Sequence, residues 1–189
     1  VLPRIIAIRK SHFRYTGRIH LRDVNFKNMV KLMIPKMIGH PVEQLKFFTF
    51  TRIATLLSVG SVTSLSFARN FQSAPVSLFG IAISVAAFPV LSACAAKQCR
   101  SEFTNHFFKA LKTILFWTIP AGIGLYLLSD IPIRILLGGG KFSDANILRT
   151  AGILGIFALA IPTESLIHLL ARSFYALKNT LIPVIMSLT

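Results

Sequence analysis

The sequence predicts an all-α fold, a polytopic bundle of transmembrane helices. Of its 189 residues, 53% are hydrophobic and only 14% are charged, whereas a soluble domain of this size carries about a quarter charged residues. The chain also contains apolar runs of about twenty residues, and its net charge is +15. Intrinsic disorder requires low hydrophobicity, so this composition excludes it.

The basic residues are separated from the apolar runs. Ten of the 21 precede Phe47, while residues 74–96 contain no charged side chain. A nucleic-acid groove would interleave the two kinds of residue. We therefore predict membrane lipids as partners and no nucleic acid.

Residues 1–46 are predicted to form a basic cytoplasmic stretch with one short amphipathic helix. Asp23 would cap this helix and Pro35 would end it, with lysines on its polar face. Such a helix suits an anionic membrane surface, and packing against protein fits the pattern equally well. Its apolar face would consist of Phe26, Met29, Val30, Met33 and Ile34.

Residues 47–189 are predicted to form a membrane domain. A helix needs about 20 mostly apolar residues to cross a bilayer, and strands with open edges are not tolerated in lipid. The chain begins with Val and stops within an apolar run, so we expect a fragment. The predicted spans are 47–67, 74–96, 113–129, 150–171 and a truncated 181–189.

The distribution of Lys and Arg predicts which side faces the cytoplasm. If residues 1–46 are cytoplasmic, sixteen basic residues lie on that side and four lie outside. The predicted location is therefore the inner (cytoplasmic) membrane, as a multi-pass protein. The four outside are Arg69, Arg134, Lys141 and Arg149.

Two arginines are candidates for binding an anionic substrate. Arg52 lies about five residues into the first predicted span, where a charge is costly and often marks a transport pathway, although it could also snorkel to the headgroups. Arg69, followed by Asn70, is predicted at the outer end of that span. Its guanidinium suits phosphate, and a solvated loop arginine is the alternative.

Glu164 and His168 are candidates for ion or proton coupling. Glu164 follows Pro162, which favours a local break in the helix, and His168 lies one turn further on the same face. A hydrogen bond that only packs helices is the competing interpretation. No clustered acids, nucleophile with its base or phosphate loop is present, so we predict no enzyme activity, no cofactor and no metal.

Four strings resemble the MurJ (MviN) lipid II flippases of the multidrug/oligosaccharidyl-lipid/polysaccharide exporter superfamily. The longest, SVTSLSFARNFQSAPVSLFGIAISVAAFPVLS at 61–92, is similar to the family's seventh-to-eighth helix region. The others are similar to its entry into helix seven, a turn after helix nine and a signature at the end of helix ten. They are KLMIPKMIG at 31–39, GGKF at 139–142 and LARSFYALKNTLIP at 170–183.

The resemblance implies a fragment of a two-lobe transporter, covering helices seven to ten and the start of eleven. Such a transporter flips undecaprenyl-linked lipid II from the inner to the outer leaflet by alternating access, through a cationic cavity. Many members read Ala-Asp-Arg where this chain reads Ala68, Arg69 and Asn70. The family's cavity arginine therefore aligns with Asn70, and we expect Arg69 to take its place, with Arg52 as a secondary candidate.

Other functions stay open at this point. A flippase for another lipid-linked glycan would share the architecture, although the helix-ten string disfavours it. A non-transporting scaffold that recruits cell-wall synthesis proteins through the basic stretch is a second alternative, because the aligned arginine is missing. A membrane enzyme acting on polyprenyl phosphate is the least favoured, since it needs clustered acids or histidines.

Overall fold

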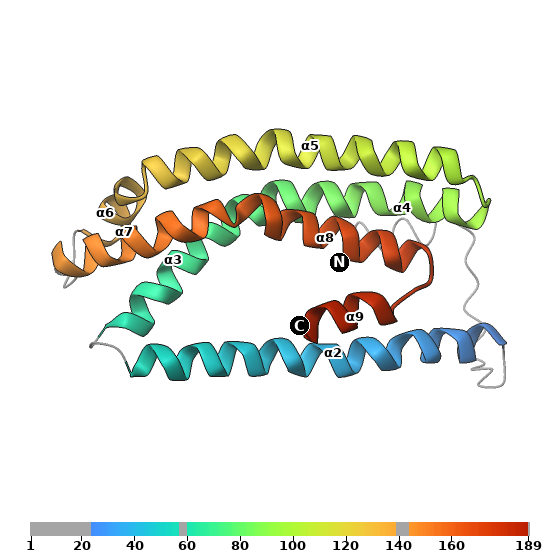
Figure 1. Cartoon of the computed structure of the whole chain (residues 1–189), viewed down its shortest axis with the longest axis horizontal. Coiled ribbons are helices and arrows are strands. Elements are labelled where there is room, and N and C mark those ends of the chain that lie inside the picture. The colour runs from blue at the N-terminus through green and yellow to red at the C-terminus, as the bar shows by residue number, and fades with distance from the viewer. Residues whose placement is uncertain (1–23, 57–59, 139–143, 189) are drawn as a thin grey trace, which may run out of the picture.

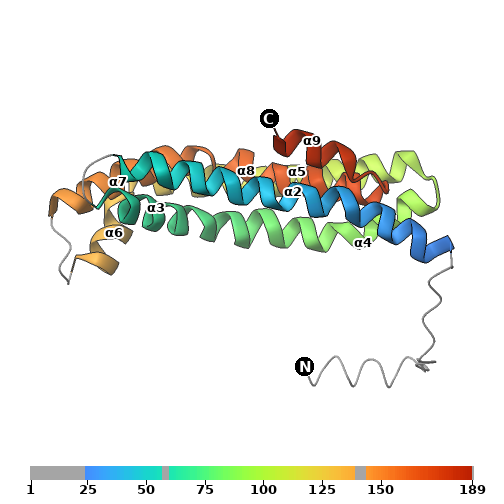
Figure 2. The same ribbon diagram turned by 90° about the horizontal axis from the view of Figure 1, so that it is seen from below.

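A computed structural model describes residues 24–56, 60–138 and 144–188, and every regular element in these ranges is helical. The predicted all-α fold is therefore confirmed. The longer helices run along one common axis (Figure 1), and the view from below shows the same elongated bundle (Figure 2). The elements are α2 (Val24–Thr55), α3 (Ser61–Pro75), the π-helical η1 (Val76–Ile81), α4 (Ala82–Ala96), α5 (Arg100–Leu127), α6 (Asp130–Leu137), α7 (Asp144–Leu159), α8 (Ile161–Ala176) and α9 (Leu181–Leu188).

The helix at the predicted first span has other bounds than the span. The helix that contains Phe47 begins at Val24, continues past Pro35 and ends at Thr55. Proline removes one backbone hydrogen bond without forcing a helix to end. The predicted span includes the break before Ser61, because the leucine and valine residues there keep the local hydropathy high. Asp23 and the basic residues before it lie outside the described ranges.

The second predicted span is part of a longer helix. Residues Ser61–Ala96 form 36 continuous helical residues, made of α3, η1 and α4. The prediction started at residue 74 because Arg69, Asn70 and Gln72 lower the hydropathy of the first turns. Pro75 precedes η1, and wide π turns of this kind interrupt regular helices, often at functional sites. The helix visibly changes direction there (Figure 1).

The helices at the third and fourth predicted spans are also longer than those spans, and α9 (Leu181–Leu188) matches the truncated last one. Helix α5 begins at Arg100 instead of residue 113, and it is followed by α6, which the sequence pattern did not predict. The predicted break near Pro162 is confirmed, because α7 and α8 meet at Ala160 with a bend of 46°. Asn179 Oδ1 caps the first turn of α9 by accepting hydrogen bonds from the amides of Leu181 and Ile182 at 3.2 and 3.3 Å.

Two helices of the described part are long and apolar enough to cross a bilayer, namely Ser61–Ala96 and Arg100–Leu127. Helices α7 and α8 are long and apolar enough only when they are taken together as one bent span. Leu78, Phe116 and Ile156 are each more than 60% exposed. Exposed apolar surface on this scale suits lipid. The chain is part of a multi-pass membrane protein.

Small residues allow the helices to approach closely. A Cβ added at Gly80 of η1 would lie 2.7 Å from Ser165 Cβ of α8, and one added at Gly122 of α5 would lie 2.9 Å from the Ala158 carbonyl oxygen. Such contacts are the usual basis of helix association in membranes, where burial of apolar surface gives little driving force. The buried hydroxyl of Ser84 donates to the Gly80 carbonyl at 2.6 Å, so this polar group is satisfied within its own helix.

Candidate functional site

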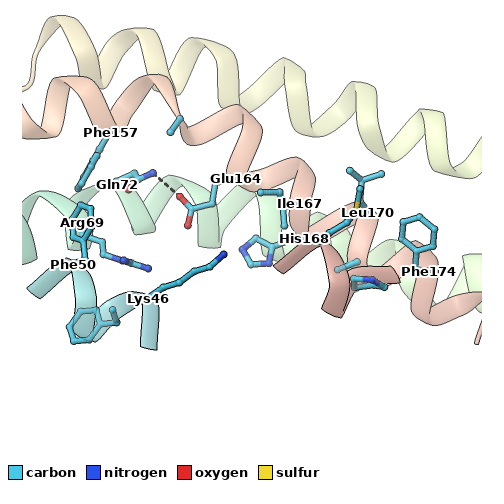
Figure 3. A pocket seen from close by; sticks show the side chains of 15 residues that line it. Lys46, Phe50, Arg69, Gln72, Phe157, Glu164, Ile167, His168, Leu170 and Phe174 are labelled. Carbon is cyan, nitrogen blue, oxygen red and sulfur yellow. Dashed lines mark hydrogen bonds between the residues drawn. The ribbon is translucent and has the colours of Figure 1, made fainter. Parts of the chain in front are cut away.

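A cavity of about 900 Å³ lies where α2, α3, α7, α8 and α9 converge. Among the described residues, five polar or charged side chains line it, together with several aromatic and aliphatic ones that include Phe50, Phe157 and Phe174. Figure 3 shows the charged side chains gathered at one end, with Leu170 and Phe174 at the other. The polar and charged members are Lys46, Arg69, Gln72, Glu164 and His168.

Helix α3 supplies Arg69 and Gln72 to the cavity. The two residues are three positions apart, so they share one face of the helix, and the preceding Ala68 is fully buried against α6 and α7. Arg69 lies eight residues after Ser61, about 12 Å along the helix axis at 1.5 Å per residue. Its guanidinium is exposed to the cavity and points into it (Figure 3).

Helix α8 supplies Glu164 and His168 from the opposite wall. Both line the cavity from one face of its first two turns, as the spacing of four residues predicts. Their position follows from the break at Ala160, because α8 starts a new helix axis there and Ser165 packs against Gly80. The sequence prediction that these two residues lie close together is consistent with this placement.

A hydrogen bond between Gln72 and Glu164 joins the two walls. Gln72 Nε2 donates to Glu164 Oε2 at 2.7 Å, and Gln72 is only 7% exposed. The donor is a neutral amide, and the bond holds the carboxyl group in one orientation. Figure 3 shows the remaining carboxylate oxygen facing the side on which Lys46 and His168 lie. Glu164 therefore presents a carboxyl group in a defined orientation to a cavity that Lys46 and Arg69 also line.

Two predicted site residues lie elsewhere. Arg52 is in the last turn of α2 and exposed, near the end of the helix opposite to the one predicted, and it is not among the residues that line the cavity. Asn70 is exposed on α3 and does not line the cavity either. Arg69 was expected at an outer helix end and lies instead within a helix. The difference follows from the helix break, which comes before Ser61 and not after Phe67.

Sequence reasoning missed Lys46 and Gln72. Lys46 was assigned to the basic cytoplasmic stretch because it adjoins the apolar run, yet α2 carries it nine residues inside the helix end at Thr55. Gln72 could have been found from its spacing of three residues from Arg69. Within the described ranges, no group of three or more His, Cys, Asp or Glu side chains is placed to hold a metal ion.

Comparison with known proteins identifies relatives over the whole chain. The family "Lipid II flippase MurJ" matches residues 1–189. A "Probable lipid II flippase MurJ" of Aquifex aeolicus is 32% identical over 97% of this chain and 35% of its own length. The "Lipid II flippase MurJ" of Thermosipho africanus is 35% identical over 64% of this chain and 24% of its own length.

A solved structure shows the same arrangement of helices. It is described as lipid II flippase MurJ in an inward closed conformation, and it superimposes with a TM-score of 0.74 at 30% identity. The match covers 97% of this chain and 38% of that one. The chain thus spans about a third of the length of the curated relatives it matches. On the family match over all its residues, the chain belongs to the MurJ lipid II flippase family.

Proposed function

We propose that this chain forms part of a flippase that moves lipid II, the undecaprenyl-linked peptidoglycan precursor, from the inner to the outer leaflet of the cytoplasmic membrane. The observation that carries the proposal is the placement of Arg69 inside a helix, where its guanidinium faces a cavity. Burying a phosphate charge without a partner is prohibitively costly, so a lipid-linked phosphate requires a cation in its path. The substrate is accordingly a lipid-linked glycan with a phosphate-containing head.

The charge distribution supports a cytoplasmic position for the end of the bundle where α2 begins. The α4–α5 turn and the α8–α9 turn lie at that same end (Figure 1), and they carry Lys97, Arg100 and Lys178. Lys27 in the first turn of α2 and Arg172 near the end of α8 add to the positive charge of this end. The opposite end holds Arg52, Arg134 and Arg149 within the described ranges. Short loops rich in Lys and Arg stay on the cytoplasmic side.

Alternating access supplies the transport step. The bend between α7 and α8 lies at Ala160, which lines the cavity, and the π-helical η1 packs against α8 through Gly80 and Ser165. Such breaks are common where transporter helices move. Because both breaks adjoin the Gln72–Glu164 hydrogen bond, a change of bend would alter that contact directly. The two states would open the charged end of the cavity to opposite leaflets.

Complementation tests the proposed function. The intact gene would be expressed in a bacterium whose own lipid II flippase can be switched off, with membrane insertion measured in the same cells. We expect growth to be restored. A well-inserted protein that fails to restore growth would contradict the assignment to lipid II, and would favour another lipid-linked glycan or a scaffold.

Glu164 is proposed to couple transport to an ion or proton gradient, with His168 beside it. Glu164→Gln keeps an oxygen that can accept the Gln72 hydrogen bond but removes the charge. We expect wild-type translocation in vesicles to increase with an imposed proton or sodium gradient, and the Glu164→Gln protein to run at the rate seen without a gradient. Glu102→Gln, at the start of α5 and outside the cavity, is the matched control. A gradient dependence retained in Glu164→Gln would exclude this role.

A further inference from the structure

Lys46 is a second cation in the cavity, and it comes from a different helix than Arg69. It lies on α2, whereas Arg69 lies on α3, and both line the same space. Figure 3 shows the Lys46 side chain extended toward Glu164 and His168, so its ammonium group reaches well into the cavity. At nine residues from the end of α2, about 13 Å along the axis, it is far from the helix terminus.

The balance of charges makes Lys46 important. Among the described residues that line the cavity, Arg69 and Lys46 are cationic and Glu164 is anionic. By formal charge, the carboxylate of Glu164, to which Gln72 is a neutral hydrogen-bond donor, offsets one of the two cations. Without Lys46, the formal charges of the described Arg and Glu side chains that line the cavity would cancel and leave no excess positive charge for an anionic ligand. Lys46 supplies the excess.

We propose that Lys46 makes the cavity selective for a lipid diphosphate over a lipid monophosphate. Arginine binds one phosphate through two parallel hydrogen bonds, and lysine adds a mobile point charge. Two cations on separate helices are suited to two linked phosphate groups, and a single phosphate already satisfied by Arg69 gains less from the second cation. This inference rests on the proposed lipid-linked substrate and names the residue that sets its head-group preference.

Two simple probes test the proposal: farnesyl diphosphate and farnesyl monophosphate, titrated into the purified protein in detergent. The protein would be expressed from its intact gene. We expect the wild type to prefer the diphosphate. Lys46→Gln should lower the affinity for the diphosphate about tenfold, the typical cost of one lost charge-assisted hydrogen bond, and leave the monophosphate nearly unchanged.

Three further variants test whether the positive charge of Lys46, and not its size or lysine charge in general, sets the preference for the diphosphate. Lys46→Arg keeps the charge and should keep the preference, and Lys46→Met is a second neutral variant of similar length. Lys109→Gln removes an exposed lysine of α5 outside the cavity and should have no effect. The thermal midpoint of each variant would be measured, so that affinities are compared between equally folded proteins.

The outcomes distinguish this inference from the proposed function. If the wild type prefers the diphosphate and Lys46→Gln keeps that preference, or weakens both probes equally, the role of Lys46 is overturned while the substrate class stands. If the wild type binds both probes equally well, there is no preference for Lys46 to set and the inference also fails. If the wild type binds neither probe, the proposed phosphate site fails, and this inference fails with it.

Discussion

Replacing Arg69 with alanine is expected to abolish the rescue of a bacterium that lacks its own lipid II flippase. The guanidinium points into the cavity from within a helix (Figure 3). Its loss leaves Lys46, opposite Glu164, as the one Lys or Arg among the described residues that line the cavity. Each charge-assisted hydrogen bond is worth roughly 1.5–3 kcal/mol, or about ten- to a hundredfold in affinity. The measurement is growth after depletion, alongside the amount of protein inserted in the membrane.

Asn70 is the matched control for Arg69. It occupies the position at which the family's arginine aligns, yet its side chain is exposed and does not line the cavity. Asn70→Ala should therefore restore growth to the wild-type level. Arg52→Ala should give the same result. Loss of rescue in Asn70→Ala together with normal rescue by Arg69→Ala would show that the aligned position, and not its neighbour, meets the substrate.

Replacing Gly80 with alanine is expected to destabilise the protein, although alanine normally favours a helix. The new Cβ would lie 2.7 Å from Ser165 Cβ and 2.8 Å from Ser165 Cα, so η1 and α8 would have to separate. Overpacking of this kind costs about 1–3 kcal/mol. Because Ser165 adjoins Glu164, the separation should also weaken the Gln72–Glu164 bond at 2.7 Å. The measurement is the thermal midpoint in detergent, followed by rescue of growth.

Gly124 gives the opposite expectation. A Cβ added there meets no atom of the described chain within 4 Å, so Gly124→Ala should be neutral or stabilising by up to about 1 kcal/mol through helix propensity. A lower thermal midpoint for Gly80→Ala and an equal or higher one for Gly124→Ala would show that the η1–α8 contact determines the effect of the added methyl group. Equal thermal midpoints for Gly80→Ala and the wild type would contradict the close approach of these helices.

The fold class could be predicted from the sequence because it depends on composition and on the length of the apolar runs. The residues at which the helices begin and end could not be predicted in this way. Between Thr55 and Ser61 the chain leaves one helix and enters another while the sequence stays apolar, and Gly60, at φ 90°, has the backbone conformation that permits the break. Hydropathy averages over about twenty residues, so it does not resolve a break of five.

The candidate site was predictable only in part. Glu164 and His168 could be paired because a spacing of four places both on one helix face, and Pro162 indicated the break before them. The chemistry of Arg69 identifies it as a candidate, but hydropathy puts it at the outer end of a span instead of within a helix. Lys46 was not recognised, because a lysine next to an apolar run is normally a cytoplasmic flank. Only the relative placement of α2, α3 and α8 brings these residues to one cavity.

The most direct test of the central claim is to locate the head group by photo-crosslinking. A lipid II analogue with a photoreactive group next to its diphosphate would be irradiated with the protein in membranes, and the labelled peptides identified by mass spectrometry. The cavity between α2, α3 and α8 predicts labelling of peptides that contain Lys46, Arg69 or Glu164, and loss of that labelling when unlabelled lipid II competes. Competed labelling confined to α5 and α6, which do not line the cavity, would contradict it.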